Sequence, residues 1–154
     1  MENLDSGSFS SPPVIKQLSV FVPNRLGELL KVTRCLDAYG LSIRSISIVE
    51  AADHAVFRLL VDRPGLAMET LRTEGYSVFE SDLLGVALPA MDSDPIRRVL
   101  SALLLAELNV HYVYSLLAPT TNTPVLAVHV EDLDAAVRAL SEKGLELIGQ
   151  EELE

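Results

Sequence analysis

The chain has 154 residues and a formal net charge of −10, and 49% of its residues are hydrophobic. Such a length suits one ordinary domain or two very small ones, with enough apolar side chains for a buried core. The excess of acidic residues argues against binding to nucleic acid or to anionic membranes, because basic residues supply most of the affinity for both. With one cysteine, Cys35, the sequence excludes an intrachain disulfide and a thiolate metal cluster.

Residues 1–13 contain no basic region followed by an apolar segment, which argues against a secretion signal. No apolar run reaches the roughly 20 residues that a membrane-spanning helix needs. We therefore expect a cytoplasmic protein in which residues 1–13 form a disordered tail.

Residues 14–82 show the patterns of strands and helices in the order βαββαβ. Alternating apolar side chains predict a strand at residues 14–22, and helical spacing predicts a helix from about Leu26 to Tyr39, closed by Gly40. The further elements expected in this half are strands at residues 41–51, 55–61 and 76–81 and a helix at residues 64–74.

Residues 83–154 repeat this order. Aligning the two halves places Leu29 on Ile96 and Val32 on Val99, so a duplication is the simplest account. The elements expected here are strands at residues 83–89, 108–119, 124–130 and 145–149 and helices at residues 93–107 and 131–144. Because no turn signal separates the strand at 76–81 from the strand at 83–89, we expect the two to be almost continuous.

Each repeated unit has about 70 residues, which is small for independent stability. The edge strands of its sheet would also be exposed. Pairing two units edge to edge, or back to back, would solve both problems.

Two motifs give the repeat a family resemblance. The first turn reads Pro-Asn-x-x-Gly-x-Leu within "VPNRLGELLKVTRCL", and the second unit contains the strand "LNVHYVYSL". Together with the duplicated order, these motifs resemble the ACT domain, and in particular freestanding tandem ACT proteins that bind amino acids. The resemblance implies an α+β fold with two ferredoxin-like units, residues 14–82 and 83–154, each an antiparallel sheet with helices packed on one face.

The resemblance also implies a binding site. In ACT domains two units pack side by side through the edges of their second strands, and effectors lie between the strand–helix turn of one unit and the second strand of its neighbour. The residues that this arrangement implies as ligand-binding are Asn24, Arg25, Leu26, Gly27 and Glu28 from the first unit and Asn109, Val110, His111 and Tyr112 from the second.

The chemistry of the first turn agrees with such a site. Without a Cβ, Gly27 allows a ligand to approach the main chain, and the first N–H groups of the following helix have no intrahelical acceptor and suit a carboxylate. Asn24 can offer its amide to the same ligand. Two simpler interpretations stand beside this one: Gly27 meets a local backbone need, and Arg25 is a solvated side chain beside Glu28.

The turn of the second unit departs from this pattern. Asp94 falls where Gly27 does in the first unit, and Asp92 precedes it. Carboxylates there would repel an anionic group, so that turn would either take a cation or start a well-capped helix, and we favour the cap. We therefore predict one competent turn per chain.

No pattern for catalysis, a metal or a cofactor is apparent. The three histidines, His54, His111 and His129, lack metal-ligand spacing, although His111 lies on the strand expected to line the seam. Tyr112 and Tyr114 are expected to share one strand face, where they serve packing or contact a ligand through one hydroxyl.

The first functional hypothesis is a non-catalytic sensor that binds a free amino acid, works as a homo-oligomer, most simply a dimer, and regulates amino-acid metabolism. The alternative is an interaction module without a small ligand, acting as a detached regulatory subunit of a metabolic enzyme. An enzyme is a third class, for which the sequence supplies no convergent set of titratable groups.

Overall fold

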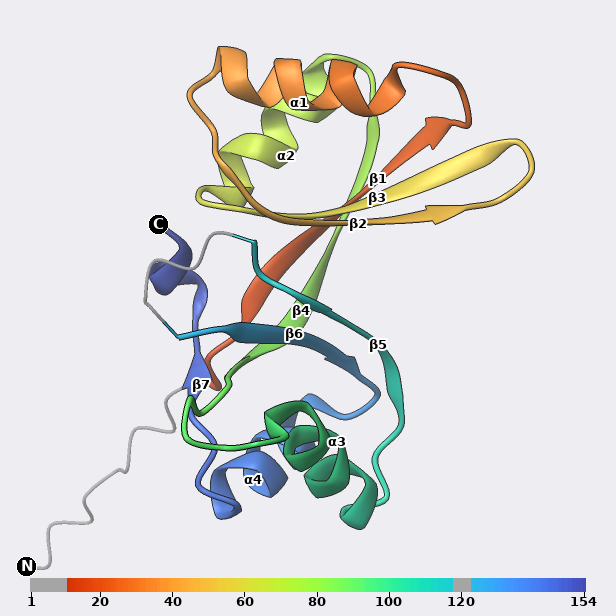
Figure 1. Cartoon of the computed structure of the whole chain (residues 1–154). Helices are drawn as coiled ribbons and strands as arrows, with labels where there is room; N and C mark the ends of the chain where they lie inside the picture. The colour runs from red at the N-terminus through yellow and green to blue at the C-terminus, as the bar shows by residue number, and fades with distance from the viewer. Residues whose placement is uncertain (1–10, 118–122) are drawn as a thin grey trace, which may run out of the picture.

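The structure, a computed structural model, describes residues 11–117 and 123–154 and contains four α-helices and seven strands in this part of the chain (Figure 1). The elements follow the order β1 (Ile15–Pro23), α1 (Glu28–Ala38), β2 (Ile43–Glu50), β3 (His54–Val61), α2 (Pro64–Thr73), β4 (Ser77–Ala87), α3 (Pro95–Leu105), β5 (Val110–Ser115), β6 (Val125–Val130), α4 (Leu133–Glu142), β7 (Leu147–Ile148) and the 3-10 helix η1 (Gln150–Leu153). The predicted α+β class and the repeated βαββαβ order are thereby confirmed.

The first half of the chain forms a helix-covered sheet that we call unit 1. Its strands lie in the order β2-β3-β1-β4, all antiparallel, and α1 and α2 cover one face (Figure 1). Alternate residues of β1, including Leu18 and Val20, point toward Val32 and Leu36 of α1 and form a fully buried core with them. The period-two pattern of the strand and the helical spacing of α1 produce this contact.

The strand β4 belongs to both halves. Its first part pairs with β1, where Leu83 lies opposite Ile15, and its second part pairs with β6, where Leu84 lies opposite Val128. The two strands expected at residues 76–81 and 83–89 are therefore one continuous strand, and the change of partner falls next to the predicted boundary at residues 82 and 83.

The second half forms a matching layer, unit 2. Its strands lie in the order β5-β6-β4-β7, and α3 and α4 cover the face that is turned away from unit 1 (Figure 1). Val99 and Leu103 of α3 pack with Leu140 of α4 and Val128 of β6, all fully buried.

The uncovered faces of the two sheets pack against each other, so the back-to-back alternative is the one adopted within the chain. A third core of buried residues, including Ile15 and Leu60 of unit 1, Leu83 of the shared strand β4 and Ala127 of unit 2, fills the space between the sheets. Gly85 of β4 lies at this contact, where a Cβ would come within 2.4 Å of the Ile15 side chain and 2.7 Å of Ile148. The close approach of the sheets therefore requires glycine at this position.

Most elements are a few residues shorter than expected, and two of the differences have a clear cause. The helix expected from Leu26 begins at Glu28, because Gly27 has a positive φ that ends the turn. The last strand has two residues rather than five, since the chain turns into η1 at Gln150. Most of the predicted disordered tail, residues 1–10, lies outside the described residues, as do residues 118–122. No described helix is long and apolar enough to cross a membrane.

Candidate functional site

The turn from β1 to α1 is an open helix start. Gly27 occupies the N-cap position with φ 86° and ψ −4°, and no side chain caps the helix. A Cβ on Gly27 would meet nothing within 4 Å. The glycine thus meets a backbone need, the left-handed conformation, and the space beside it is also empty.

The main-chain N–H groups of this turn divide into two sets. Those of Asn24 and Arg25 donate to the carbonyl oxygens of Asp53, at 3.0 Å, and Pro23, at 2.8 Å. Those of Leu26 and Gly27 have no acceptor among the described residues. The N–H groups of this turn that are open to a ligand are therefore those of Leu26 and Gly27, and not those of Asn24 and Arg25.

Asn24 connects the turn to the hairpin between β2 and β3. Its Nδ2 donates to the carbonyl oxygen of Ala51 at 3.2 Å, so one donor of its side chain is already used by the protein. Glu28 lies on the other side of the helix start, almost buried, with its carboxylate 3.5 Å from the Lys31 ammonium. These two predicted site residues hold the turn in place.

A cavity of about 360 Å³ lies between this turn and the outer ends of β2 and β3. Its size falls within the range of small-ligand sites. Polar groups at its edge are Asn24, Arg25 and Glu50, whereas the remaining lining residues are Pro23, Leu26, Gly27, Leu29, Ile48, Ala55 and Phe57. The lining of the cavity thus supplies two unoccupied N–H donors, from Leu26 and Gly27, the cation of Arg25, the carboxylate of Glu50 and an apolar wall.

Glu50 also lines the cavity, although it is not among the site residues that the sequence indicates. It is the last residue of β2 and lines the cavity from the strand that follows α1. No local motif marks this position. Glu50 comes near the turn because β3 pairs with both β2 and β1, which places the ends of these two strands in the same part of the sheet.

The predicted site residues of unit 2 do not line this cavity in the same chain. Asn109 is exposed and its carbonyl oxygen accepts from the Glu131 N–H at 3.1 Å, while Val110 packs against the core of unit 2. Along β5, a register shift between Val110 and Tyr112 interrupts the strict alternation. His111 is exposed, and its ring centroid lies 5.1 Å from that of His129.

Tyr112 instead takes part in a polar contact between the units. Gln17 of β1, with no exposed surface, donates through Nε2 to the Tyr112 hydroxyl and accepts through Oε1 from the Tyr114 hydroxyl, both at 2.7 Å. The Arg58 guanidinium lies 3.6 Å from the centroid of the Tyr112 ring. The prediction that the two tyrosines share a strand face is confirmed, with ring centroids 6.3 Å apart, and both contact Gln17 of unit 1.

Two of the histidines are neighbours in space, although their spacing in the sequence is not that of metal ligands. The ring of His129 lies 5.1 Å from that of His111 and 4.7 Å from that of Tyr112. Burial, followed by the charges of His111 and Arg58, lowers the pKa of His129 below its usual 6.5. Its buried Nδ1 has no hydrogen-bond partner among the described residues. No group of three metal-ligating side chains occurs in the described part of the chain.

The turn that leads into α3 is capped by its own side chains. The Asp94 carboxylate accepts from the Arg97 N–H at 3.2 Å, and the Asp92 carboxylate accepts from the Asp94 N–H at 3.1 Å. Arg97 and Arg98 also pair with these carboxylates, at 3.1 and 3.5 Å. The predicted cap at this turn is confirmed.

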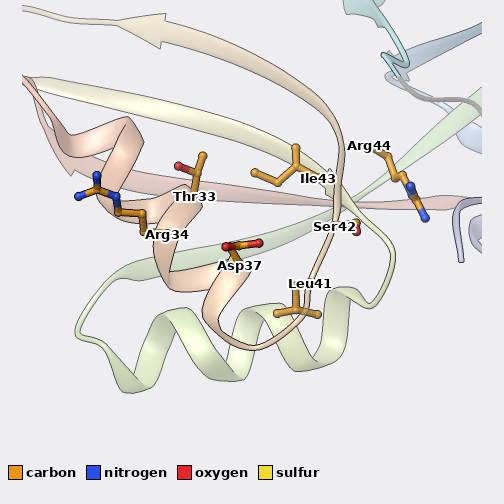
Figure 2. A pocket seen from close by; sticks show the side chains of 7 residues that line it. All are labelled: Thr33, Arg34, Asp37, Leu41, Ser42, Ile43 and Arg44. Carbon is orange, nitrogen blue, oxygen red and sulfur yellow. The ribbon is translucent and has the colours of Figure 1, made fainter.

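A second surface cavity, of about 450 Å³, lies between α1 and the start of β2 (Figure 2). Its two arginines, Arg34 and Arg44, project at opposite ends and away from each other in Figure 2. The Arg44 Nε already donates to the carbonyl oxygen of Leu153 at 2.8 Å. Because its charged groups do not converge, this cavity is a weaker site candidate than the one at Gly27.

Comparison with known proteins gives a family and several similar folds. A family model described as an ACT domain pair matches residues 13–154. Among curated proteins, none matches the chain. The crystal structure of protein BT0572 from Bacteroides thetaiotaomicron is 28% identical, with a TM-score of 0.82 over 91% of this chain and 95% of that one.

Two regulatory subunits of aspartate kinase share the fold at lower identity. The ligand-free subunit from Thermus thermophilus is 18% identical, with a TM-score of 0.61 over 86% of this chain and 95% of that one. The subunit from Thermus flavus is 17% identical, with a TM-score of 0.54 over 84% of this chain and 92% of that one.

Proposed function

The chain belongs to the ACT domain pair family, and on that premise we propose that it is a non-catalytic sensor that binds a free amino acid and regulates amino-acid metabolism. ACT domains are regulatory modules, and the two units, residues 14–82 and 83–154, are the two ACT domains of the pair. The observation that carries the proposal is the uncapped helix start at Gly27, where Leu26 and Gly27, whose N–H groups have no acceptor among the described residues, line a cavity of small-ligand size.

The groups around this cavity match the parts of an amino acid. The N–H groups of Leu26 and Gly27, at the positive end of the α1 dipole, would receive the carboxylate, with Arg25 as a further cation. Glu50 would receive the ammonium group. Leu29, Ile48 and Phe57 offer an apolar wall to the side chain of the ligand.

The cavity is open on one side, and a second copy of the chain would complete it. Asn109 and His111 are exposed, but they do not line the cavity of their own chain. In a homo-oligomer, most simply a dimer in the cytoplasm, they would approach the turn of the other copy. Ligand binding would then stabilise the oligomer in which the turn of one copy contacts Asn109 and His111 of the other copy.

The alternative function is that of a detached regulatory subunit of a metabolic enzyme, acting without a small ligand. The likeness to chains that are named regulatory subunits of aspartate kinase favours it, although at 18% identity this likeness establishes the fold alone. Co-purification of an enzyme in the absence of any amino acid would favour this alternative.

Isothermal titration calorimetry of the full chain against the twenty amino acids tests the sensor. We expect heat from at least one of them, and we expect Glu50→Gln to weaken that binding by about tenfold or more, because an ion pair is lost. Glu69→Gln, at an exposed position of α2, is the matched control and should bind like the wild type. No heat from any amino acid at millimolar concentration would remove the proposal.

If the Glu50 and Glu69 variants bound an amino acid equally well, the ammonium group of the ligand would have to bind at another position.

A second pair of variants, at two arginines, tests which of the two cavities binds the amino acid. Arg25→Ala should weaken binding, whereas Arg34→Ala, in the cavity of Figure 2, should not.

A further inference from the structure

The face of unit 1 that is turned away from its helices is only partly covered by unit 2. Along β1, Ile15 and Gln17 are fully buried against unit 2, whereas Phe21, on the same face of the strand, is 43% exposed. Along β4, Leu83 is buried and Phe79 is 59% exposed. The outer half of this sheet face therefore lies open to solvent.

The open half carries an apolar surface that we call the aromatic strip, formed by Phe21, Phe79, Val49 and Val56. The strand register places Val56 opposite Phe21 and Val49 opposite Val56, so three neighbouring strands contribute to one row. The Phe79 ring meets the Phe21 ring edge to face, with centroids 5.4 Å apart. Val49 is 42% exposed. Contiguous exposed apolar groups of this kind mark interaction sites.

The strip continues the contact that already exists between the two units. From Gln17 at the buried contact, the same face of β1 runs through Ser19 to Phe21. Arg58, next along this face on β3, marks the border, because its guanidinium lies on the Tyr112 ring of unit 2. The aromatic strip is thus an uncovered extension of a sheet-to-sheet interface.

Charge favours self-association through this face. The described strand positions beside the strip on the same face hold no carboxylate, and they are Ser19, Pro23, Ser47, His54, Arg58, Ser77 and Ser81. Residues 14–82 hold 8 basic and 9 acidic side chains, whereas residues 83–154 hold 4 and 11. Two copies can therefore approach through unit 1 with little repulsion, which is not so for unit 2.

We propose that the aromatic strip binds the aromatic strip of a second copy of this chain about a two-fold axis. A two-fold contact uses the same patch on both copies, and a flat row of phenylalanine and valine side chains is complementary to itself. The contact buries the strip in the way that unit 2 buries the other half of the same face. It does not require an amino acid, and it differs from edge-to-edge pairing of β2 strands.

Sedimentation velocity of the full chain over a range of concentrations, without added amino acid, tests the proposal. The wild type should dimerise, and Phe21→Ser with Phe79→Ser should weaken the dimer by about a hundredfold or more, since buried aromatic anchors dominate interfaces. Leu104→Ser with Leu105→Ser is the matched control. These leucines of α3 are more exposed, at 75% and 73%, and their replacement should leave the dimer unchanged.

A monomeric wild type would overturn the proposal, and so would a dimer that survives in a folded Phe21/Phe79 variant, because that dimer would be held by the β2 edges or by another face. Circular dichroism identifies a variant that fails to fold. A second test does not depend on the folding of the serine variants. Phe79→Cys in a Cys35→Ser background should form a covalent dimer on mild oxidation, and reduction of the disulfide should reverse it. Absence of that cross-link in a chain that dimerises would also place the interface elsewhere.

Discussion

The two strand–helix turns of this protein occupy equivalent places in the repeat, but the helix that follows is uncapped in unit 1 and capped by a side chain in unit 2. At the start of α1, Gly27 supplies no side chain and leaves two N–H donors beside a cavity. At the start of α3, Asp94 accepts from the Arg97 N–H, and Asp92 supports it from the preceding turn. A duplicated fold has thus kept one helix start open and closed the other with its own carboxylate.

This difference teaches that the shared fold sets the position of the turn, whereas one residue decides whether an anion can reach it. A carboxylate ligand and the Asp94 carboxylate would compete for the same kind of N–H donor. The open turn and the capped turn are therefore two forms of the same structural element, one free to accept a ligand carboxylate and one occupied by a carboxylate of the chain. Variants can test each of them.

The largest effect is expected from closing the open turn. Gly27→Val should reduce amino-acid binding by more than about tenfold, because the side chain enters the cavity and the strained backbone displaces the Leu26 and Gly27 N–H groups. The left-handed φ of 86° should also cost about 1–2 kcal/mol of stability. Calorimetry and urea unfolding measure the two effects separately.

Gly75→Val is the matched control for this change. Gly75 has φ 92° and equally open surroundings, but it follows α2 and lines no part of the cavity. It should lose similar stability and retain binding. Equal loss of binding in both variants would mean that stability, and not the site, accounts for the effect at Gly27.

An intermediate effect is expected from opening the capped turn. Asp94→Ala should lower the free energy of unfolding by about 1 kcal/mol, since an N-cap acceptor is removed. Ser93→Ala, beside it, should change stability much less. Urea unfolding of both variants measures the difference, and an Asp94→Ala protein as stable as the wild type would show that solvent replaces the cap.

A second difference between the units is that unit 2 carries the His111–His129 pair, whereas unit 1 carries the aromatic strip. The smallest effect is expected from this histidine pair. His129 has a pKa below 6.5 in the folded chain because burial, His111 and Arg58 oppose its protonation. Below pH 6.5 the unfolded chain therefore takes up a proton that the folded chain does not. Stability should fall as the pH drops from 6.5 toward the folded pKa.

Thermal unfolding between pH 7.5 and 5, in the wild type and in His129→Gln, measures this contribution. The variant should show a flatter pH dependence in the window below pH 6.5. His54→Gln, at an exposed position at the start of β3, should keep the wild-type slope. Parallel slopes in the wild type and the His129 variant would contradict the lowered pKa.

The elements of the fold were predictable because their signals are local. Helical spacing in α1, strict alternation in β2 and the Asp94 cap depend on residues within a few positions of one another. The repeat in these local signals sufficed to predict two βαββαβ units. The β5 register shift was not predictable, since it depends on pairing with β6 and brings His111 beside His129.

The candidate site was predictable only in part, for the same reason. Gly27 and its neighbours form one short turn, so the sequence could indicate an open helix start. Glu50 joins that turn across a sheet, and Asn109 and His111 stay away from it within one chain. Which residues meet at the cavity depends on how sheets and copies dock, and a single turn carries no information on docking.

By itself the sequence determined where helices and strands occur, that the pattern repeats, and which of the two turns could be open, because backbone conformation and amphipathic spacing act over one turn or one strand. The tertiary structure decided that the two sheets lie back to back, that Gly85 allows Ile15 and Ile148 to approach, and that Gln17 binds both tyrosines. These features join residues far apart in the chain, and only close packing of the whole molecule selects them.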